Sequence, residues 1–406
     1  MTPKPLTTVR TLLILSALMA FGPLSTDLYL PALPALGRAL RAGPDEMALT
    51  LSSYLIGFSF GQLLWGPIGD RYGRRLPVAA GLALFVIGSA GCGASTTAWQ
   101  MIGWRVVQSV GASAGPVLAR AMVRDLYARE RSAQMLSTLM TVMAIAPLAG
   151  PFVGGQILVA ASWRAIFWTL MGLGCAALAA LLVLPETLPA SRRSRQPLGA
   201  AFMGYASLAR DSRLIGYAAI GGLYYGGIFA YIAASPFVYI EYYRVRPEWF
   251  GLFFALPILG IMAVNLINTR LVMRFGGDLL CRFGAGAAAA AGLVALLEAR
   301  TGWGGFYGLV AAMVAYGASS GFIVANSVAG ALAAFPHRAG GASAFVGAFH
   351  YGSGIFSAAL VGWLADGTAV PMAAILAAGG VGSFLCTLGL APVAATPVAV
   401  KESALK

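Results

Sequence analysis

Two residues with ionisable side chains stand inside long apolar segments of the sequence. Asp27 lies in PLSTDLYLPALP (residues 23–34), and Arg105 begins RVVQSVGASAG (residues 105–115). A charged group in an apolar medium is costly unless it is paired or hydrated, so such residues are functional candidates. Burial favours the neutral form of a carboxyl group, and a nearby cation favours its charged form. We therefore expect Asp27 to bind and release a proton, with Arg105 stabilising the carboxylate.

The alternative role for Asp27 and Arg105 is a permanent ion pair that fixes the packing of two helices. Asp27 lies six residues before the end of its apolar segment at residue 33, and Arg105 lies six residues after the start of another at residue 99. If these are the same ends of two membrane-spanning helices, both residues lie roughly 9 Å below one membrane boundary. Charges at a common depth can pair.

The elements that must position these residues are membrane-spanning helices. The chain has 406 residues, of which 59% are hydrophobic and only 10% are charged, unlike a soluble protein. A bilayer core about 30 Å thick requires roughly 20 apolar residues in a helix. We predict an all-α membrane protein with twelve transmembrane helices. They are expected at 10–33, 47–69, 77–95, 99–122, 134–160, 163–184, 214–238, 249–272, 280–298, 304–333, 342–364 and 369–391.

The positive charges predict how the chain crosses the membrane. Of the 27 Lys and Arg residues, twenty lie on one predicted side, six lie on the other, and Arg105 lies within the membrane. Lys and Arg gather on the cytoplasmic side, so both termini are expected there. This arrangement accounts for the net charge of +13, and no nucleic-acid partner is expected. The four cysteines fall singly in different segments, so no metal or cofactor is expected.

A polar, basic connection divides the chain into two halves. We predict an N-terminal six-helix bundle at 1–184, a cytoplasmic linker at 185–213 and a C-terminal six-helix bundle at 214–406. The sequence RYG (71–73) after the second segment returns as RFG (274–276) after the eighth, at an offset of half the chain. Many secondary transporters are built from such repeated halves.

Two further motifs are rich in glycine. GPIGDRYGRR (66–75) allows a sharp turn, and its aspartate beside three arginines offers ion pairs that form and break, which suits a gate. The alternative is an orientation signal alone. In APLAGPFVGG (146–155) small residues and prolines permit close backbone contact and a bend. The residues expected in this tight helix interface are Pro147, Gly150, Pro151, Gly154 and Gly155.

Polar and aromatic side chains within the segments are candidates for contacts with a transported molecule. Aromatic faces with hydroxyl tips suit flat, moderately polar compounds. For an isolated polar group, an interhelical hydrogen bond is the alternative role. His350 can also titrate near neutral pH, so it is the second candidate for proton coupling. The candidates are Asp27, Tyr54, Gln108, Tyr225, Phe229, Asn265, Asn326 and His350.

Several of these motifs resemble those of a known family. GPIGDRYGRR, RVVQSVGASAG and APLAGPFVGG resemble the loop, fourth-span and antiporter signatures of the major facilitator superfamily. STDLYLPALP (25–34), SPFVYIE (235–241), FPHRAGGASAF (335–345) and RDLY (124–127) resemble the bicyclomycin-resistance and chloramphenicol-exporter group, often called Bcr/CflA. The resemblance extends over both halves of the chain.

The resemblance implies the major facilitator fold, with two pseudo-symmetric six-helix bundles. It also implies a drug:proton antiporter of a bacterial inner membrane that works by alternating access, with Asp27 and Arg105 at the proton-coupling positions. In relatives, the loop signature holds the cytoplasmic ends of the two halves together. The gating residues it implies are Gly66, Asp70, Arg71, Gly73, Arg75 and Asp125. Met273 replaces the aspartate in the second copy, so an asymmetric gate is expected.

The expected function is therefore the export of small amphipathic drugs, coupled to protons, by a monomer in the lipid bilayer. An exporter of the same fold that moves a metabolite, such as an amino acid or a sugar, is the alternative. A channel or receptor fits less well, because repeated halves and a lone buried acid are what alternating access needs. An enzyme is not expected, because no metal-spaced or nucleophilic set of residues is present.

Overall fold

The structure is a computed structural model that describes residues 5–127, 129–193, 210–333, 335 and 339–389. Most of the predicted linker, residues 194–209, lies outside the described residues. The long helices are α1 (Pro5–Asp27), α3 (Pro44–Tyr72), α4 (Arg75–Ala94), α5 (Ala98–Leu126), α6 (Arg129–Ala160), α7 (Trp163–Leu181), α9 (Ser212–Pro236), α10 (Pro247–Phe275), α11 (Gly277–Thr301), α12 (Gly305–Ala333), α13 (Ala339–Trp363) and α14 (Val370–Gly389). The short elements are η1 (Leu30–Ala32), α2 (Leu33–Leu40), η2 (Ala190–Arg192) and η3 (Phe237–Tyr242).

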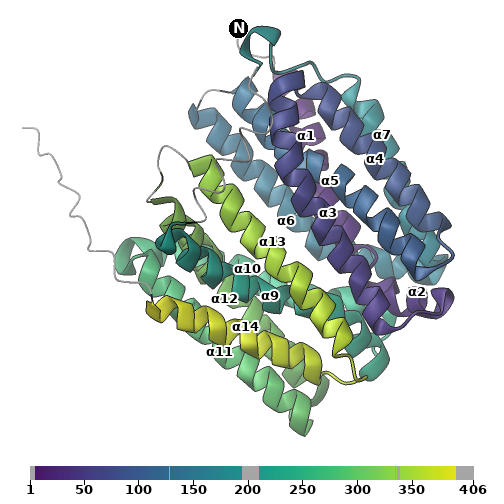
Figure 1. The fold of residues 1–406 in the computed structure, drawn as a ribbon, viewed down its shortest axis with the longest axis vertical. Helices are drawn as coiled ribbons and strands as arrows, with labels where there is room; N and C mark the ends of the chain where they lie inside the picture. Colours follow the sequence, from purple (N-terminus) through teal and green to yellow (C-terminus); the bar gives the residue numbers. More distant parts are fainter. Residues whose placement is uncertain (1–4, 128, 194–209, 334, 336–338, 390–406) are drawn as a thin grey trace, which may run out of the picture.

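The long helices gather into two bundles (Figure 1). Helices α1 and α3 to α7 form the upper right bundle in this view, and α9 to α14 form the lower left bundle. In the described part of the chain, eleven segments are long and apolar enough to cross a membrane, and α6 adds the shorter apolar stretch Ile145–Ala160. The prediction of an all-α membrane protein with twelve long helices is confirmed.

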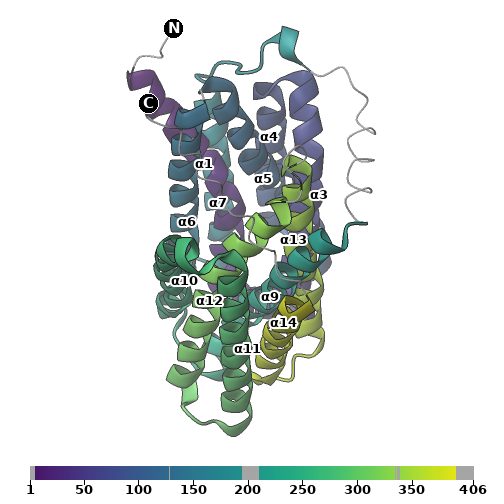
Figure 2. The same ribbon diagram turned by 90° about the vertical axis from the view of Figure 1, so that its left-hand side faces the viewer.

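The two bundles meet along two pairs of helices (Figure 2). Helix α3 packs on α13, and α6 packs on α10. At the end of the molecule that carries Arg38, called the Arg38 end, Arg38 Nη1 donates to Glu241 Oε1 of the other bundle at 2.8 Å. Nearby, Gln156 of α6 donates to the Glu248 carbonyl of α10 at 3.5 Å. Helix packing and polar contacts therefore close the bundles on each other at the Arg38 end.

The first apolar segment is not one straight helix. Helix α1 ends at Asp27, η1 follows with Pro31 inside it, and α2 begins with Pro34 at its second position. Proline lacks the N–H that an inner helical turn needs, and Pro31 and Pro34 accordingly stand in the first positions of these two short segments. The break places Asp27 at a helix terminus instead of in the middle of a spanning helix.

The predicted glycine and proline interface lies where α6 passes between α1 and α10. A Cβ on Gly150 would lie 3.0 Å from the Asp27 Cβ, and one on Gly154 would overlap the Leu28 carbonyl oxygen. Pro151 and Gly155 lie against α10, and Pro147 is one turn before Pro151 on α6. Because a side chain at Gly154 has no room, α6 can approach the end of α1 only with glycine there.

Candidate functional site

Arg105 is fully buried in the N-terminal bundle, where aromatic rings and uncharged hydrogen-bond acceptors surround its guanidinium group. Its Cζ lies 4.1 Å from the ring centre of Tyr29 and 4.2 Å from that of Tyr54. Nη1 donates to the Ser25 carbonyl at 2.9 Å and to Gln108 Oε1 at 2.6 Å. A guanidinium group between two ring faces is attracted by both, most strongly away from water. Arg105 is thereby fixed to the end of α1.

Asp27 does not pair with Arg105 in this structure. The residue is 6% exposed, and Thr26 Oγ1 donates to its carboxylate at 3.1 Å. The ion pairs of the described residues do not include Asp27. Two residues turn an α-helix by roughly 200°, so Asp27 faces away from the side on which Ser25 lies. Arg105 lies at the level of Asp27 in the N-terminal bundle, because it bonds to Ser25, two residues earlier. The rotation of α1 about its axis, however, directs Asp27 toward Gly150 of α6 and not toward Arg105.

Tyr54 and Gln108 belong to the same buried network as Arg105. The Tyr54 hydroxyl contacts Ser25 Oγ and donates to the Gly22 carbonyl at 3.2 Å. Gln108 accepts from Arg105 and donates to Ser89 Oγ at 2.9 Å. The structure therefore brings together these two predicted cargo residues, but their polar groups already have partners within the N-terminal bundle.

A continuous row of aromatic rings crosses from one bundle to the other. Phe58 of α3 lies 5.6 Å from Tyr351 of α13, and Tyr351 lies 5.9 Å from Phe229 of α9, between ring centres. Neighbouring rings along the whole row are 4.6 to 6.0 Å apart. The aromatic row consists of Tyr54, Phe58, Tyr351, Phe229, Tyr225 and His350.

Four members of the aromatic row were predicted from the sequence, whereas Phe58 and Tyr351 were not. Phe58 follows Tyr54 by four residues, so the helical period offered a signal for it. Tyr351 follows His350 directly, but which bundle its ring would reach depends on how α13 packs. His350 stacks on Tyr225 at 4.6 Å, and its Nε2 has no hydrogen-bond partner among the described residues.

The two predicted asparagines lie apart from the aromatic row. Asn326 of α12 donates to Asn268 Oδ1 of α10 at 2.9 Å and to the Phe322 carbonyl at 2.8 Å. This is an interhelical hydrogen bond within the C-terminal bundle, which was the alternative role for such residues. Asn265 is exposed on α10. Neither contacts the other predicted cargo residues in the described interactions.

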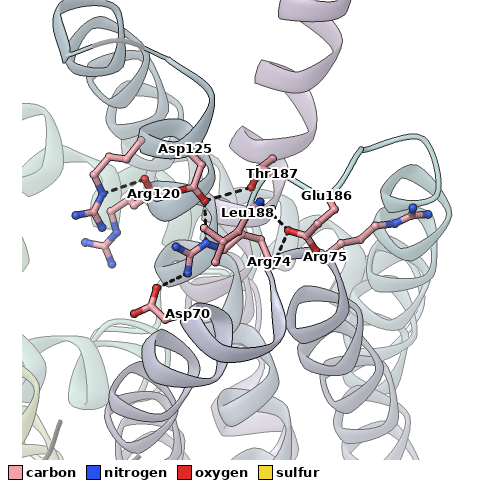
Figure 3. Close-up of polar contacts among 9 residues, drawn as sticks. Asp70, Arg74, Arg75, Arg120, Asp125, Glu186, Thr187 and Leu188 are labelled. Atoms are coloured by element: carbon pink, nitrogen blue, oxygen red, sulfur yellow. Dashed lines mark hydrogen bonds and ion pairs between the residues drawn. The ribbon is translucent and has the colours of Figure 1, made fainter. Parts of the chain in front are cut away.

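The loop signature forms a charged cluster at the opposite end, called the Arg74 end (Figure 3). Arg74 Nη1 donates to Asp70 at 2.7 Å, and its Nε donates to Asp125 at 2.8 Å. Thr187 also donates to Asp125, at 3.3 Å. We call Asp70, Arg74 and Asp125 the Arg74 cluster. All of its members belong to the N-terminal bundle, so in this structure the cluster ties α3, α4 and α5 together.

Two of the expected gating residues, Arg71 and Arg75, are not among the ion pairs of the described residues in this structure. The guanidinium of Arg71 lies over the ring of Tyr72, at 5.7 Å, and Arg75 donates to the Leu182 carbonyl at 3.0 Å. Arg74, one of the three arginines noted beside the aspartate but not one of the expected gating residues, lies between the two acids. The sequence offers three arginines, and only the turn at Gly73, with φ of +93°, determines which one faces inward.

Glu186, which follows α7 in the sequence, also contacts this loop. Its carboxylate accepts backbone N–H bonds from Arg74 at 2.8 Å, Arg75 at 3.1 Å and Leu188 at 2.9 Å. The start of α4 thus receives a negative charge, which suits a helix N-terminus. Burial alone would raise the pKa of Glu186, but these N–H groups outweigh it and hold the pKa below its ordinary value. No motif in the sequence pointed to this contact.

The charges of the cluster also stabilise Arg74. Burial alone would lower the pKa of Arg74, but the hydrogen bonds and charges of Asp125 and Asp70 outweigh it and raise the pKa above its ordinary value. Arg74 therefore stays cationic.

Gly66 has open space around it and makes no close helix contact. In the described residues no group of three or more His, Cys, Asp or Glu side chains is placed to hold a metal ion.

Two six-helix bundles that meet along two helix pairs, with an acid and an arginine buried near that contact, define a membrane transporter rather than an enzyme. Comparison with known proteins agrees. The family model of the Major Facilitator Superfamily matches residues 13–358, and the chain belongs to this superfamily. It is a multi-pass membrane protein of a class that binds small-molecule substrates.

Relatives are similar over nearly the whole chain. The MFS-type transporter YdgK of Bacillus subtilis is 35% identical over 370 residues, which cover 89% of this chain and 90% of YdgK. A bicyclomycin resistance protein homolog of Haemophilus influenzae is 30% identical over 366 residues, covering 90% and 91%. Among solved structures, the nucleoside transporter NupG has a TM-score of 0.76 at 14% identity, covering 93% of this chain and 97% of NupG. At that identity the likeness shows the fold alone.

Proposed function

We propose that this transporter exports small amphipathic drugs, bicyclomycin- or chloramphenicol-like, in exchange for protons, and that Asp27 is the proton acceptor. The observation that carries the proposal is the place of Asp27, a buried carboxyl group at the terminus of α1 with Thr26 as its hydrogen-bond partner and no ion pair among the described residues. A carboxyl group keeps its proton while it is shielded from water, and it releases the proton when water or a cation reaches it.

The contact between Arg105 and Ser25 supports a role for Arg105 in this cycle. Arg105 Nη1 donates to the carbonyl of Ser25 at 2.9 Å, two residues before Asp27 on α1. Any shift of α5 against α1 therefore changes the surroundings of the carboxyl group. Arg105 acts as a positioning residue in this state, and it becomes a charge partner for Asp27 only if the end of α1 rotates.

The closure at the Arg38 end supports alternating access. With both termini in the cytoplasm, the Arg38 end faces outward, so the structure corresponds to a state closed to the outside of a bacterial inner membrane. The cluster at Arg74 then lies on the cytoplasmic side. The similarity to a bicyclomycin resistance protein homolog supports the class of cargo. The transporter works as a monomer in this proposal.

The test replaces Asp27 by Asn in a bacterial host that lacks its own drug exporters. We expect wild type to lower susceptibility to chloramphenicol or bicyclomycin and to couple drug efflux to proton movement in membrane vesicles. Asp27→Asn should abolish the drug-driven proton signal. Glu298→Gln is the matched control, because Glu298 is also 6% exposed but lies in the other bundle, in the last turn of α11. Its proton signal should remain.

Two outcomes contradict the proposal. A full drug-driven proton signal in Asp27→Asn would exclude Asp27 as the coupling group. Unchanged susceptibility of the wild-type host to every compound would favour the alternative cargo, a metabolite such as an amino acid or a sugar.

A further inference from the structure

A cavity of about 450 Å³ opens on the surface of the N-terminal bundle at the Arg74 end. The end of α3, the start of α4 and the end of α7 line it, and α4 and α7 pack on each other. The bundles meet through α3 with α13 and through α6 with α10. In Figure 1, α4 and α7 lie on the side of their bundle that faces away from the C-terminal bundle. The cavity is therefore separate from the contact between the bundles.

The walls of the cavity are largely apolar. They include Leu76 in the first turn of α4, Leu178 in the last turn of α7, and Leu182, which directly follows α7. Leu76 and Leu182 are 66% and 75% exposed, although both helices are long and apolar enough to cross a membrane. Apolar surface at the end of a spanning helix is favourable against acyl chains and unfavourable against water.

Two arginines stand at the polar edge of the cavity, and a guanidinium group has five N–H donors. Arg75 Nη2 donates to the Leu182 carbonyl at 3.0 Å, so this side chain reaches from α4 to the end of α7. Arg193 Nη2 lies against the turn at Gly73, where an added Cβ would be 2.8 Å from it. Neither arginine pairs with a carboxylate among the described residues. In Figure 3 the side chain of Arg75 extends away from Arg74.

The Nε of Arg193 is shielded from water and has no hydrogen-bond partner among the described residues. A buried donor without an acceptor is unfavourable, and a charged donor more so. If Arg75 and Arg193 served only as orientation signals, water would surround both side chains, but both are half-buried. Their placement favours an anionic acceptor at the edge of the cavity.

Glu186 is the acid that lines the cavity, and its carboxylate is occupied by backbone N–H groups at 2.8, 2.9 and 3.1 Å. Two guanidinium groups against one carboxylate leave one positive charge in excess. Arg71, whose guanidinium lies over the ring of Tyr72, and the exposed Arg192 add charge of the same sign nearby. The edge of the cavity is therefore cationic.

From these contacts we propose that the cavity binds one anionic phospholipid of the cytoplasmic leaflet, such as phosphatidylglycerol. The phosphate lies between Arg75 and Arg193, and an acyl chain lies along Leu76, Leu178 and Leu182. Guanidinium groups bind phosphate oxygens by charge-assisted hydrogen bonds, and basic pockets between helices on the cytoplasmic side suit anionic headgroups. The proposal rests on the proposed function only in the orientation, with the Arg74 end in the cytoplasm.

A zwitterionic phospholipid, such as phosphatidylethanolamine, offers the same phosphate together with an ammonium group, so the two headgroups must be compared. The ammonium group would stand near both guanidinium groups and would need a carboxylate beside it. Glu186 is a weak partner for it, because backbone N–H groups already occupy the carboxylate oxygens. The excess positive charge therefore favours the anionic headgroup.

The experiment measures lipid binding to the purified full-length protein in uncharged detergent micelles, by native mass spectrometry. The probes are dioleoyl phosphatidylglycerol, phosphatidylethanolamine and phosphatidylcholine, which share their acyl chains. We expect wild type to bind phosphatidylglycerol about tenfold more tightly than phosphatidylcholine. Phosphatidylglycerol should also raise the midpoint of thermal unfolding of wild type, because it binds the folded protein alone.

Variants separate the charge from the apolar wall. Arg75→Gln combined with Arg193→Gln should reduce the preference to about twofold or less. Arg193→Gln alone should reduce it to about threefold or less, and this side chain has no hydrogen bond among the described residues whose loss would disturb the fold. Arg274→Gln combined with Arg282→Gln is the matched control, because it removes two exposed arginines from the C-terminal bundle. Its preference should equal that of wild type. Leu182→Asn should weaken binding of all three lipids by a similar factor.

Glycerol 3-phosphate separates a lipid site from a site for a soluble phosphate. It carries the phosphate without an acyl chain, so at an equal concentration it should not displace phosphatidylglycerol. Displacement as effective as that by the lipid itself would overturn the assignment to a phospholipid.

Equal binding of phosphatidylglycerol and phosphatidylcholine by wild type overturns the proposal, and tighter binding of phosphatidylethanolamine overturns the anionic headgroup. A preference that survives in the variant without Arg75 and Arg193 overturns the site. The readout needs neither a drug nor a proton gradient. If Asp27→Asn keeps its drug-driven proton signal while the lipid preference is as expected, the proposed coupling fails and the lipid site stands.

Discussion

The turn between α3 and α4 and the turn between α10 and α11 share a backbone but differ in chemistry. Each contains a glycine at positive φ, Gly73 at +93° and Gly276 at +78°. In each, the arginine two residues earlier lies over the ring of the next residue, at 5.7 and 5.3 Å. The short sequence echo between RYG and RFG is therefore a repeat of structure, at equivalent places in the two bundles.

What the second turn lacks is the charged cluster. Met273 stands where Asp70 stands in the first copy and is 89% exposed, and a Cβ on Gly276 would meet open space. A Cβ on Gly73 would instead meet the carboxylate of Glu186 at 2.6 Å. The turn therefore forms with glycine and without the ion pairs, which are an addition to one bundle. The predicted asymmetry of the loop has its structural basis here.

The largest difference between the turns should come from their arginines. Arg74→Ala leaves Asp125, whose side chain is 14% exposed, without its cation, and we expect a loss of about 3 kcal/mol of stability. Arg274→Ala removes the exposed arginine of the second turn, which corresponds to Arg71, and should cost about 0.5 kcal/mol or less. Thermal unfolding of the purified variants measures both. Equal losses would show that the Arg74 cluster adds no stability.

The glycines should differ by less. Gly73→Ala and Gly276→Ala both force a side chain to a positive φ, and each should cost about 1 kcal/mol for that reason. Gly73→Ala also displaces the Glu186 carboxylate from its N–H donors, so about 2 kcal/mol in total is expected. The midpoints of thermal unfolding should fall in that order. A larger loss for Gly276→Ala would contradict the contrast between a crowded and an open turn.

The smallest expected effect is the charge of Glu186, which the second turn does not have. Glu186→Gln should cost about 0.5 kcal/mol at pH 7, since the residue is exposed and sits at the N-terminus of α4. The folded protein holds the pKa of Glu186 below its ordinary value of 4.5, so the stabilisation is present above pH 4.5. It is lost as the pH falls through the folded pKa. A stability difference from wild type that persists in strong acid would exclude a charge effect.

The sequence was sufficient to predict which segments carry Asp27, Arg105 and the loop signature. It was not sufficient to predict which side chains these residues contact. Asp27 and Arg105 share a level because each lies a similar distance along its helix. They do not pair, because Ser25 and Asp27 face different sides of α1 and Arg105 takes the side of Ser25. In the same way, the loop signature predicted an acid beside an arginine, but the turn at Gly73 directs Arg74 rather than its neighbours to Asp70.

The sequence by itself determined the membrane class, the count of long helices and the repeated halves, because these follow from apolar length, charge bias and local backbone demands. It also marked Asp27, since a charge in an apolar segment is visible without a structure. Only the tertiary structure decided that rings rather than a carboxylate hold Arg105, and that Phe58, Tyr351 and Phe229 meet across the bundles. These contacts depend on how each helix is rotated about its axis, and that rotation is set by packing between segments far apart in the chain.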